Sequence, residues 1–348
     1  MGDGRAETML RSAEAVAYWG AAAPVLASLP AVGYRLACAR GDWLFRRQDG
    51  KRTELMRNLR QVLGELSPAA AQQVTRDWFR FASCQALDVK LLRRGARPLK
   101  RLVEIQGREH LEAALAAGKG AIVCCAHFGS YDSGISVLHA SGFPVTSIGR
   151  WQYKYTARLS SGERRFWDLV YGRPLRRHRQ RPNIEPWPGR FEVAALAAAA
   201  LRANEVVTLA VDAPPLDSDR ARAVEVPFLG RRAGLLPGVV TLAQLTGAPV
   251  LTSFLYRSAD YRHQVLEISP PVPVGGDAAT AFGRCAAAVS TAIRRSPAHW
   301  VYWASRADLA SLGLISSPQD RSPADDSPPA SNAELLPAQT ADHVAAAG

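Results

Sequence analysis

The feature that most constrains the fold is an alternation of short apolar runs with longer helical patterns. The run Ala121–Ala126 has no strongly polar side chain, which is typical of a central strand covered on both faces. This alternation predicts an α/β fold whose central sheet is mostly parallel or mixed and is flanked by helices. The other predicted strands are 144–148, 206–211, 249–256 and 264–268, and the predicted helices are 52–66, 69–92, 109–117, 134–140, 156–170, 191–203, 237–246 and 278–295.

The two ends of the chain differ from this body. Residues 15–34 form a run of 20 residues without a charge, but alanine dominates it and two prolines interrupt it. This run predicts a buried helix pair, a hairpin in the membrane interface or a full span. From Ser316 onward proline, alanine and acids replace the aromatic residues, which predicts a disordered tail. We therefore divide the chain into an N-terminal apolar, helical segment that is a candidate for membrane association (1–40), a main domain (41–315) and a disordered tail (316–348).

The chain is strongly basic. It holds 43 Lys+Arg against 31 Asp+Glu, a formal net charge of +12, and only five of the basic residues are lysines. This arginine surplus reflects either the codon bias of an Ala- and Arg-rich genome or a partner with phosphates or carboxylates, which guanidinium groups bind bidentately. Nucleic acid, an anionic membrane surface and an acidic cofactor are the partners that the charge leaves open.

The most informative stretch follows the run Ala121–Ala126. In open α/β sheets, ligands bind beyond the carboxyl ends of the strands. His127 stands at such an end, Gly129 permits a tight turn, and Asp132 follows five residues after the histidine. If Asp132 lies in the first turn of the next helix, its carboxylate can fold back and fix the imidazole tautomer, which leaves the other ring nitrogen as a base. The pair predicts direct deprotonation of an acceptor hydroxyl, with a purely structural histidine as the alternative.

Sequence motifs of several other enzyme classes are absent. The chain has no GxSxG elbow, which disfavours an acyl-enzyme hydrolase. It has no P-loop, GxGxxG or HExxH either, which weakens NTPase, dinucleotide-binding and zinc-protease interpretations. No third ligand at a suitable spacing joins His127 and Asp132, and no CxxC pair supports zinc. We therefore expect neither a metal nor a cofactor.

Several blocks of sequence carry a resemblance to a known family. The stretch AIVCCAHFGSYDSG resembles the HX4D/E motif of the lysophospholipid acyltransferase superfamily. It is most similar to the bacterial lipid A biosynthesis acyltransferase branch, which includes phosphatidylinositol mannoside acyltransferases. The resemblance continues, in the order of the branch, through GREHLEAALAAGKG, VVTLAVDAPP, VEVPFLGRRAGLLPGVVTLAQLTGAPVL and SPAHWVYWASR. It covers roughly residues 12–310, and these ordered blocks are far more specific than HX4D alone.

The resemblance implies a glycerolipid acyltransferase-like fold and an activity. A fatty acyl group would pass from an acyl-carrier-protein or acyl-CoA thioester, the co-substrate, to a hydroxyl of a lipid or glycolipid. His127 would be the general base, and Asp132 would orient it and stabilise its protonated form. Arg150, Asp212 and Arg231 match polar positions that line the family's site, and the two arginines would bind an anion or the oxyanion. Asp212 also ends a predicted strand, so it should face the same sheet edge as His127.

Two departures from the branch leave the acceptor open. Ala213 stands where the branch usually has glutamine, and the acid of the motif is Asp132 rather than glutamate. A phosphoglycolipid, a lysophospholipid or a hydroxyl or amine of a specialised metabolite fits as well as lipid A. The sequence also leaves open a thioesterase and, more distantly, a non-catalytic protein that binds anionic lipid or nucleic acid. Trp300 and Trp303 are predicted to pack in the core or at a membrane interface.

The expected location and partners follow from the same observations. Five scattered cysteines, two of them adjacent, argue against a disulfide framework and favour a reducing compartment. We expect a peripheral or weakly anchored protein at the cytoplasmic face of the plasma (inner) membrane. Its partners would be an acyl carrier protein or CoA thioester, a lipid or glycolipid acceptor and an anionic membrane surface. No nucleic-acid partner is expected, because no recognition motif or aromatic stacking platform accompanies the charge.

Overall fold

The structure is a computed structural model that describes residues 29–64, 66–92, 100–149, 184 and 192–316. In these residues a six-stranded sheet has the strand order β1-β8-β7-β2-β4-β3. All neighbouring strands are parallel except β7 and β8, which pair in antiparallel fashion. The strands are β1 (Val103–Gln106), β2 (Ala121–Cys125), β3 (Val145–Ser147), β4 (Val206–Ala210), β7 (Val250–Arg257) and β8 (Gln264–Ile268). The predicted α/β fold with a mostly parallel, mixed sheet is confirmed.

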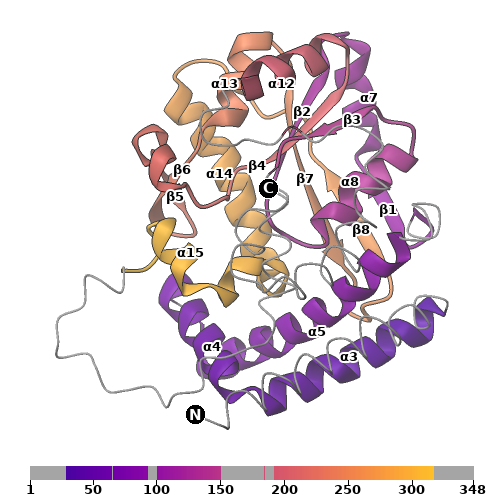
Figure 1. Cartoon of the computed structure of the whole chain (residues 1–348), viewed down its shortest axis with the longest axis vertical. Coiled ribbons are helices and arrows are strands. Elements are labelled where there is room, and N and C mark those ends of the chain that lie inside the picture. Colours follow the sequence, from indigo (N-terminus) through magenta and orange to yellow (C-terminus); the bar gives the residue numbers. More distant parts are fainter. Residues whose placement is uncertain (1–28, 65, 93–99, 150–183, 185–191, 317–348) are drawn as a thin grey trace, which may run out of the picture.

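Helices cover both faces of this sheet (Figure 1). One face carries α7 (Arg108–Ala116) and α8 (Tyr131–Ala140), and the other carries α12 (Glu192–Arg202), α13 (Gly238–Thr246) and α14 (Ala278–Arg295). Because helices lie on both sides, β2 is buried at all five positions, as its apolar sequence predicts.

Helix α14 shows how the sequence specifies one of these layers. Its buried positions recur at helical spacing, from Ala281 and Phe282 through Cys285 to Val289. The carboxylate of Asp277 accepts hydrogen bonds from the backbone N–H groups of Ala279 and Thr280 and so caps the start of the helix. The predicted bounds of this helix are confirmed.

Three N-terminal helices lie below the sheet in Figure 1: α3 (Pro30–Arg47), α4 (Asp49–Leu63) and α5 (Pro68–Leu92). Helices α3 and α5 run side by side. A Cβ at Gly41 of α3 would lie 2.5 Å from the Cα of Arg80 on α5, so only glycine allows the two backbones to approach so closely. The hydrogen bond from Trp78 Nε1 to the carbonyl of Trp300, 3.2 Å long, joins α5 to the C-terminal segment.

The N-terminal segment is described only from Leu29 onward. The part of the uncharged run from Pro30 to Tyr34 belongs to α3, whose buried face includes Tyr34 and Ala37. None of the helices described is long and apolar enough to cross a membrane. Residues 1–28, the helix predicted over 156–170 and the tail from residue 317 lie outside the described residues.

Some elements were not predicted from the sequence. These are the part of α3 after residue 34, the short edge strand β1, the antiparallel hairpin of β5 (Val224–Phe228) and β6 (Arg231–Leu235), and α15 (Arg306–Ser311). Three 3-10 helices, 217–222, 297–299 and 301–304, were also not predicted. Helix α8 begins at Tyr131, three residues before the predicted start, because the chain turns at Gly129 and enters the helix directly after Ser130.

The turn after β2 depends on Gly129. Its φ of 66° lies in the left-handed region, and a Cβ there would lie 2.0 Å from the carbonyl oxygen of Leu255. We expect Gly129→Ala to lower the free energy of unfolding by more than about 3 kcal/mol, because the clash adds to the backbone strain. Chemical denaturation measures this loss.

Gly118→Ala is the matched control. The φ of Gly118 is 72°, but a Cβ there would have no neighbour within 4 Å. The free energy of unfolding of this variant should therefore fall by only about 1 kcal/mol. Equal losses in the two variants would contradict the close approach of the Gly129 turn to β7.

Candidate active site

The sheet brings His127 and Asp212 to the same edge. Strands β2 and β4 pair in parallel, with Cys125 opposite Ala210 at their carboxyl ends. The N–H of Val211 donates to the carbonyl of Cys125 at 3.0 Å, so the pairing continues one residue beyond β4. His127 and Asp212 each follow two residues after a member of the terminal pair. The expectation that Asp212 faces the same sheet edge as His127 agrees with this register.

The Asp212 carboxylate contacts both the backbone and the ring of His127. The backbone N–H of His127 donates to Oδ1 and Oδ2 of Asp212, at 3.0 and 2.9 Å. The ring atom Nδ1 lies 2.8 Å from Oδ1. Both side chains are fully buried. One carboxylate therefore holds the main chain and the imidazole of the same residue.

Two aromatic residues near the end of the main domain complete this arrangement. Trp300 Nε1 donates to Oδ2 of Asp212 at 2.8 Å, and the hydroxyl of Tyr302 lies 3.1 Å from Nδ1 of His127. Trp300 and Trp303 are buried and in edge-to-face contact, as the packing prediction expected. No pattern in the sequence indicated that Trp300 would also donate to the carboxylate of Asp212. The N–H donors compensate Asp212 for its burial away from water.

The contacts of His127 indicate its tautomer. An ionised carboxylate only accepts hydrogen bonds, so the contact with Asp212 places the ring proton on Nδ1. The other ring nitrogen, Nε2, is buried, and none of the described residues forms a hydrogen bond with it. A neutral imidazole in this state presents the lone pair of Nε2, which can take a proton from a hydroxyl group.

The carboxylate at Nδ1 is Asp212, whereas the sequence pattern predicted Asp132 in the orienting role. Asp132 lies in the first turn of α8, partly exposed. Asp212 comes two residues after the neighbouring strand β4. Its carboxylate can therefore approach Nδ1 of His127 more directly than the carboxylate of Asp132, which lies at the start of α8. A catalytic role for Asp132 stays a prediction.

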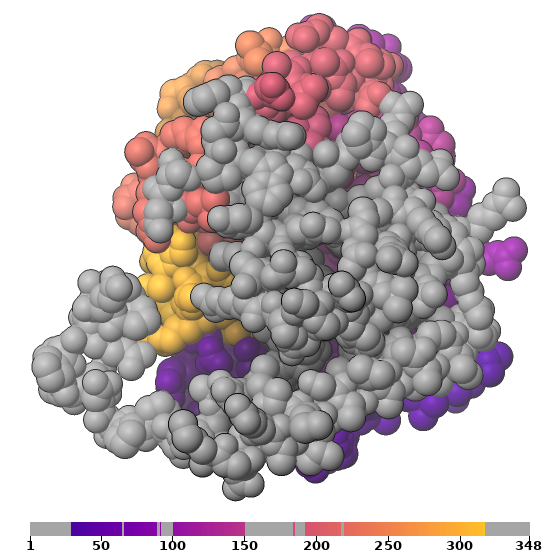
Figure 2. Space-filling model, viewed as in Figure 1, coloured from indigo at the N-terminus to yellow at the C-terminus, as the bar shows by residue number. Residues whose placement is uncertain are grey.

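The two predicted anion-binding arginines are placed differently. Arg150 lies outside the described residues. Arg231 is exposed on the β5–β6 hairpin, which lies at the surface of the molecule in Figure 2, and it donates to the carbonyl of Gln61 on α4. Among the described residues, Arg231 makes no hydrogen bond with His127 or Asp212. Anion binding by these arginines stays a prediction.

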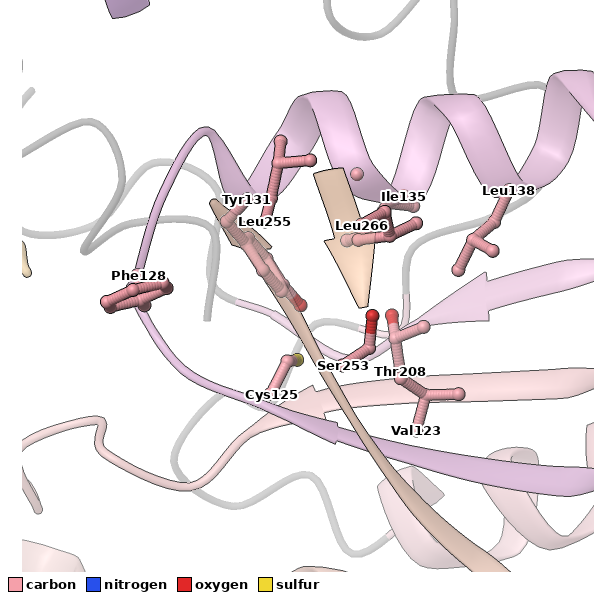
Figure 3. A pocket seen from close by; sticks show the side chains of 11 residues that line it. Val123, Cys125, Phe128, Tyr131, Ile135, Leu138, Thr208, Ser253, Leu255 and Leu266 are labelled. Carbon is pink, nitrogen blue, oxygen red and sulfur yellow. The ribbon is translucent and has the colours of Figure 1, made fainter. Parts of the chain in front are cut away.

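An apolar cavity lies beside the turn that carries His127 (Figure 3). It lies between α8 and the sheet. Ile135 and Leu138 point into it from the helix, and Val123 and Leu255 line it from the strands. Tyr131 also lines it, and its ring centroid lies 6.2 Å from that of His127. Tyr131 thus lies between the apolar cavity and the ring of His127.

Comparison with known proteins identifies the class of enzyme that this fold and site represent. The family model of the bacterial lipid A biosynthesis acyltransferases matches residues 5–306. The chain belongs to this family, and it is an acyltransferase.

Two curated relatives are similar to the chain over most of their length. A lipid A biosynthesis acyltransferase of Haemophilus influenzae is 23% identical over 246 residues, which cover 68% of this chain and 69% of the relative. A phosphatidylinositol mannoside acyltransferase of Mycobacterium tuberculosis is 28% identical over 298 residues, which cover 81% of this chain and 85% of the relative. The resemblance seen in the sequence motifs is confirmed.

A second buried histidine, His299, supports the turn after β2 through its backbone carbonyl and its ring. The carbonyl of His299 accepts a hydrogen bond from the N–H of Gly129 at 2.9 Å. Its ring contacts Phe81 and Phe128, with centroids 4.9 and 5.5 Å away. Burial, and then the positive charge of Arg257, lower the pKa of His299 to about 3. His299 is therefore neutral in the folded protein at ordinary pH.

The low pKa of His299 predicts how stability depends on pH. An unfolded histidine has a pKa of about 6.5, so between pH 6.5 and 3 the unfolded state binds one more proton than the folded state. The stability that the neutral ring contributes is complete above pH 6.5 and falls by about 1.4 kcal/mol per pH unit below it. Between pH 7.5 and pH 5, the free energy of unfolding of the wild type should fall by about 2 kcal/mol more than that of His299→Gln, as measured by urea denaturation. Equal losses would mean that His299 keeps an ordinary pKa in the fold.

Proposed function

We propose that the protein transfers a fatty acyl group from an acyl-carrier-protein or acyl-CoA thioester to a hydroxyl of a lipid or glycolipid. The observation that carries this proposal is the buried His127 in a chain of this acyltransferase family. Its Nδ1 is bound by Asp212, and its Nε2 has no hydrogen-bond partner in the part of the chain that the structure describes. A histidine in this state suits the deprotonation of an acceptor hydroxyl.

The proposed reaction is a single displacement. Nε2 of His127 takes the proton of the acceptor hydroxyl while the hydroxyl oxygen attacks the thioester carbonyl. The tetrahedral intermediate then collapses, the C–S bond breaks, and the departing thiolate receives the proton from Nε2. Asp212 holds the ring in the productive tautomer and stabilises the imidazolium that forms between the two proton transfers. No acyl-enzyme intermediate is needed, because donor and acceptor react directly when they are held together.

Features around the site support a substrate with a hydrocarbon chain. The cavity between α8 and the sheet is lined mostly by apolar side chains, such as Ile135, Leu138 and Leu266. The names of both curated relatives refer to lipids, lipid A in one and phosphatidylinositol mannoside in the other. Lipid A, a phosphoglycolipid and a lysophospholipid are the candidate acceptors. In the proposal, Arg150 and Arg231 bind phosphates or the oxyanion.

The proposed location is the cytoplasmic face of the plasma (inner) membrane. Helix α3 and the residue before it expose apolar side chains at helical spacing: Leu29, Val32, Leu36 and Trp43. The guanidinium of Arg47 lies over the ring of Trp43, 5.3 Å from its centroid. Apolar side chains flanked by arginines suit the interface of an anionic bilayer.

Substitution of the histidine and of the two aspartates tests the mechanism. His127→Ala should lower kcat for acyl transfer about 1,000-fold or more, because the base is lost. Asp212→Asn should lower it about 100-fold to 10,000-fold, because the ring loses the partner that fixes its tautomer. Asp132→Asn should cause a smaller loss, since Nδ1 is bound by Asp212 in the structure. The assay measures transfer of radiolabelled palmitate from palmitoyl-CoA and from palmitoyl acyl carrier protein to lipid extracts and lysophospholipids.

Each outcome of these assays distinguishes one mechanism from another. Full activity of His127→Ala would contradict the proposed base. A larger loss in Asp132→Asn than in Asp212→Asn would return the orienting role to Asp132. Release of free palmitate without an acylated lipid would instead identify a thioesterase, in which water takes the place of the hydroxyl. Thermal unfolding of each variant distinguishes a lost function from a lost fold.

A further inference from the structure

A buried polar cluster lies next to the catalytic turn and takes no part in the proposed chemistry. Its centre is Asp88 of α5, which is fully buried. The carboxylate accepts hydrogen bonds from Tyr34 of α3 at 2.5 Å and from Gln264 of β8 at 3.3 Å. It also accepts from Arg257 at the end of β7 and from the hydroxyl of Ser130. One carboxylate therefore joins three separate elements to the turn between β2 and α8.

The stability of the fold does not by itself explain this cluster. The side chains of Arg257 and Asp88 are 1% and 0% exposed, so both charges have lost their hydration. Their attraction offsets that loss only when every polar atom is satisfied, and apolar residues of similar volume often stabilise a protein as well or better. Nε of Arg257 is buried and has no hydrogen-bond partner within residues 29–64, 66–92, 100–149, 184 and 192–316. The free-energy cost of burying these polar groups is consistent with a cluster whose role is to hold a neighbouring segment in one conformation.

Ser130 indicates which part of the molecule the cluster fixes. This serine occupies the N-cap position of α8, where a serine hydroxyl usually accepts a hydrogen bond from the helix backbone. Here the side chain makes no capping bond and instead donates to Asp88. The hydroxyl thus connects the turn to α5 and leaves the helix end uncapped.

A second contact from α5 reaches the same turn. Nε2 of Gln85, one helical turn before Asp88, donates to the carbonyl of Gly129 at 3.4 Å. From the other side, the N–H of Gly129 donates to the carbonyl of His299. The turn that begins with His127 and leads into α8 is therefore held between α5 and the C-terminal segment.

We propose that Asp88 is a positioning residue that holds, through Ser130, the turn carrying His127 and Asp132. This inference rests on the proposed function of His127 as the base. Asp88 does not touch the reacting atoms. Its role is to keep the base at the distance from the acceptor hydroxyl that proton transfer requires, because a displacement of about 1 Å is enough to cost a large factor in rate.

The test is Ser130→Ala, which removes the link to the turn and leaves Asp88 with its three other donors. Hydrogen–deuterium exchange should rise in the peptide that spans residues 126–133. In the palmitoyl transfer assay, kcat should fall about tenfold while KM changes little, because the base is misplaced and substrate binding is intact. Ser130→Thr, which keeps a hydroxyl, should recover part of both effects.

Tyr261→Phe is the matched control. It removes a tyrosine hydroxyl bond of 3.1 Å to another carboxylate of α5, Asp77, and keeps the Tyr261 carbonyl that accepts a hydrogen bond from Arg257. This variant should leave both the exchange of 126–133 and kcat close to the wild type.

The exchange measurement needs no substrate, so it tests the positioning role even if the wild type transfers no palmitate. Unchanged exchange of 126–133 in Ser130→Ala would overturn the inference. So would a kcat equal to that of Tyr261→Phe.

Discussion

The site depends on one contact, the hydrogen bonds from the backbone N–H and ring Nδ1 of His127 to the Asp212 carboxylate. The contact follows from the parallel register of β2 and β4, which brings the residues after Cys125 and after Ala210 to one edge of the sheet. A carboxylate bound to both the main chain and the ring leaves the imidazole little freedom to rotate. The geometry of the His127 ring is thus a consequence of strand pairing in the centre of the fold.

Burying this carboxylate requires hydrogen-bond donors, and the chain supplies one from a distant segment. The indole of Trp300 donates to Asp212, while Tyr302, 175 residues along the chain from His127, contacts Nδ1. An isolated bridge between Phe128 and Trp300 fixes this segment against the turn that follows β2. The last part of the main domain therefore packs in the core and also supplies hydrogen-bond partners for the buried polar groups of the site.

The sequence predicts the sheet well because its strands are short, apolar and separated by helical patterns. Strand β8 and helix α14 have the predicted bounds, and most other elements begin and end within three residues of them. The β5–β6 hairpin was not predicted, since Arg231 and Arg232 interrupt any apolar alternation in its second strand. Edge strand β1 has only four residues, too few for a periodic signal.

The site was predicted in part, for a similar reason. His127 and Asp212 each follow an apolar strand, so their common edge could be deduced from the sequence. Which carboxylate reaches Nδ1 depends on the strand order, which places β4 next to β2, and no local pattern encodes that order. The bond from Trp300 to Asp212 and the buried cluster around Asp88 join residues far apart in sequence, and only the folded structure shows them.

The most direct test of the proposed mechanism is the protonation pattern of the His127 ring, observed by nitrogen-15 NMR of histidine-labelled protein. The chain has seven histidines, and the His127→Ala spectrum identifies the signals of this one. In the neutral ring, the mechanism predicts a proton on Nδ1 and an unprotonated Nε2, with this preference lost in Asp212→Asn. A neutral ring with its proton on Nε2 would contradict the assignment of His127 as a base held by Asp212.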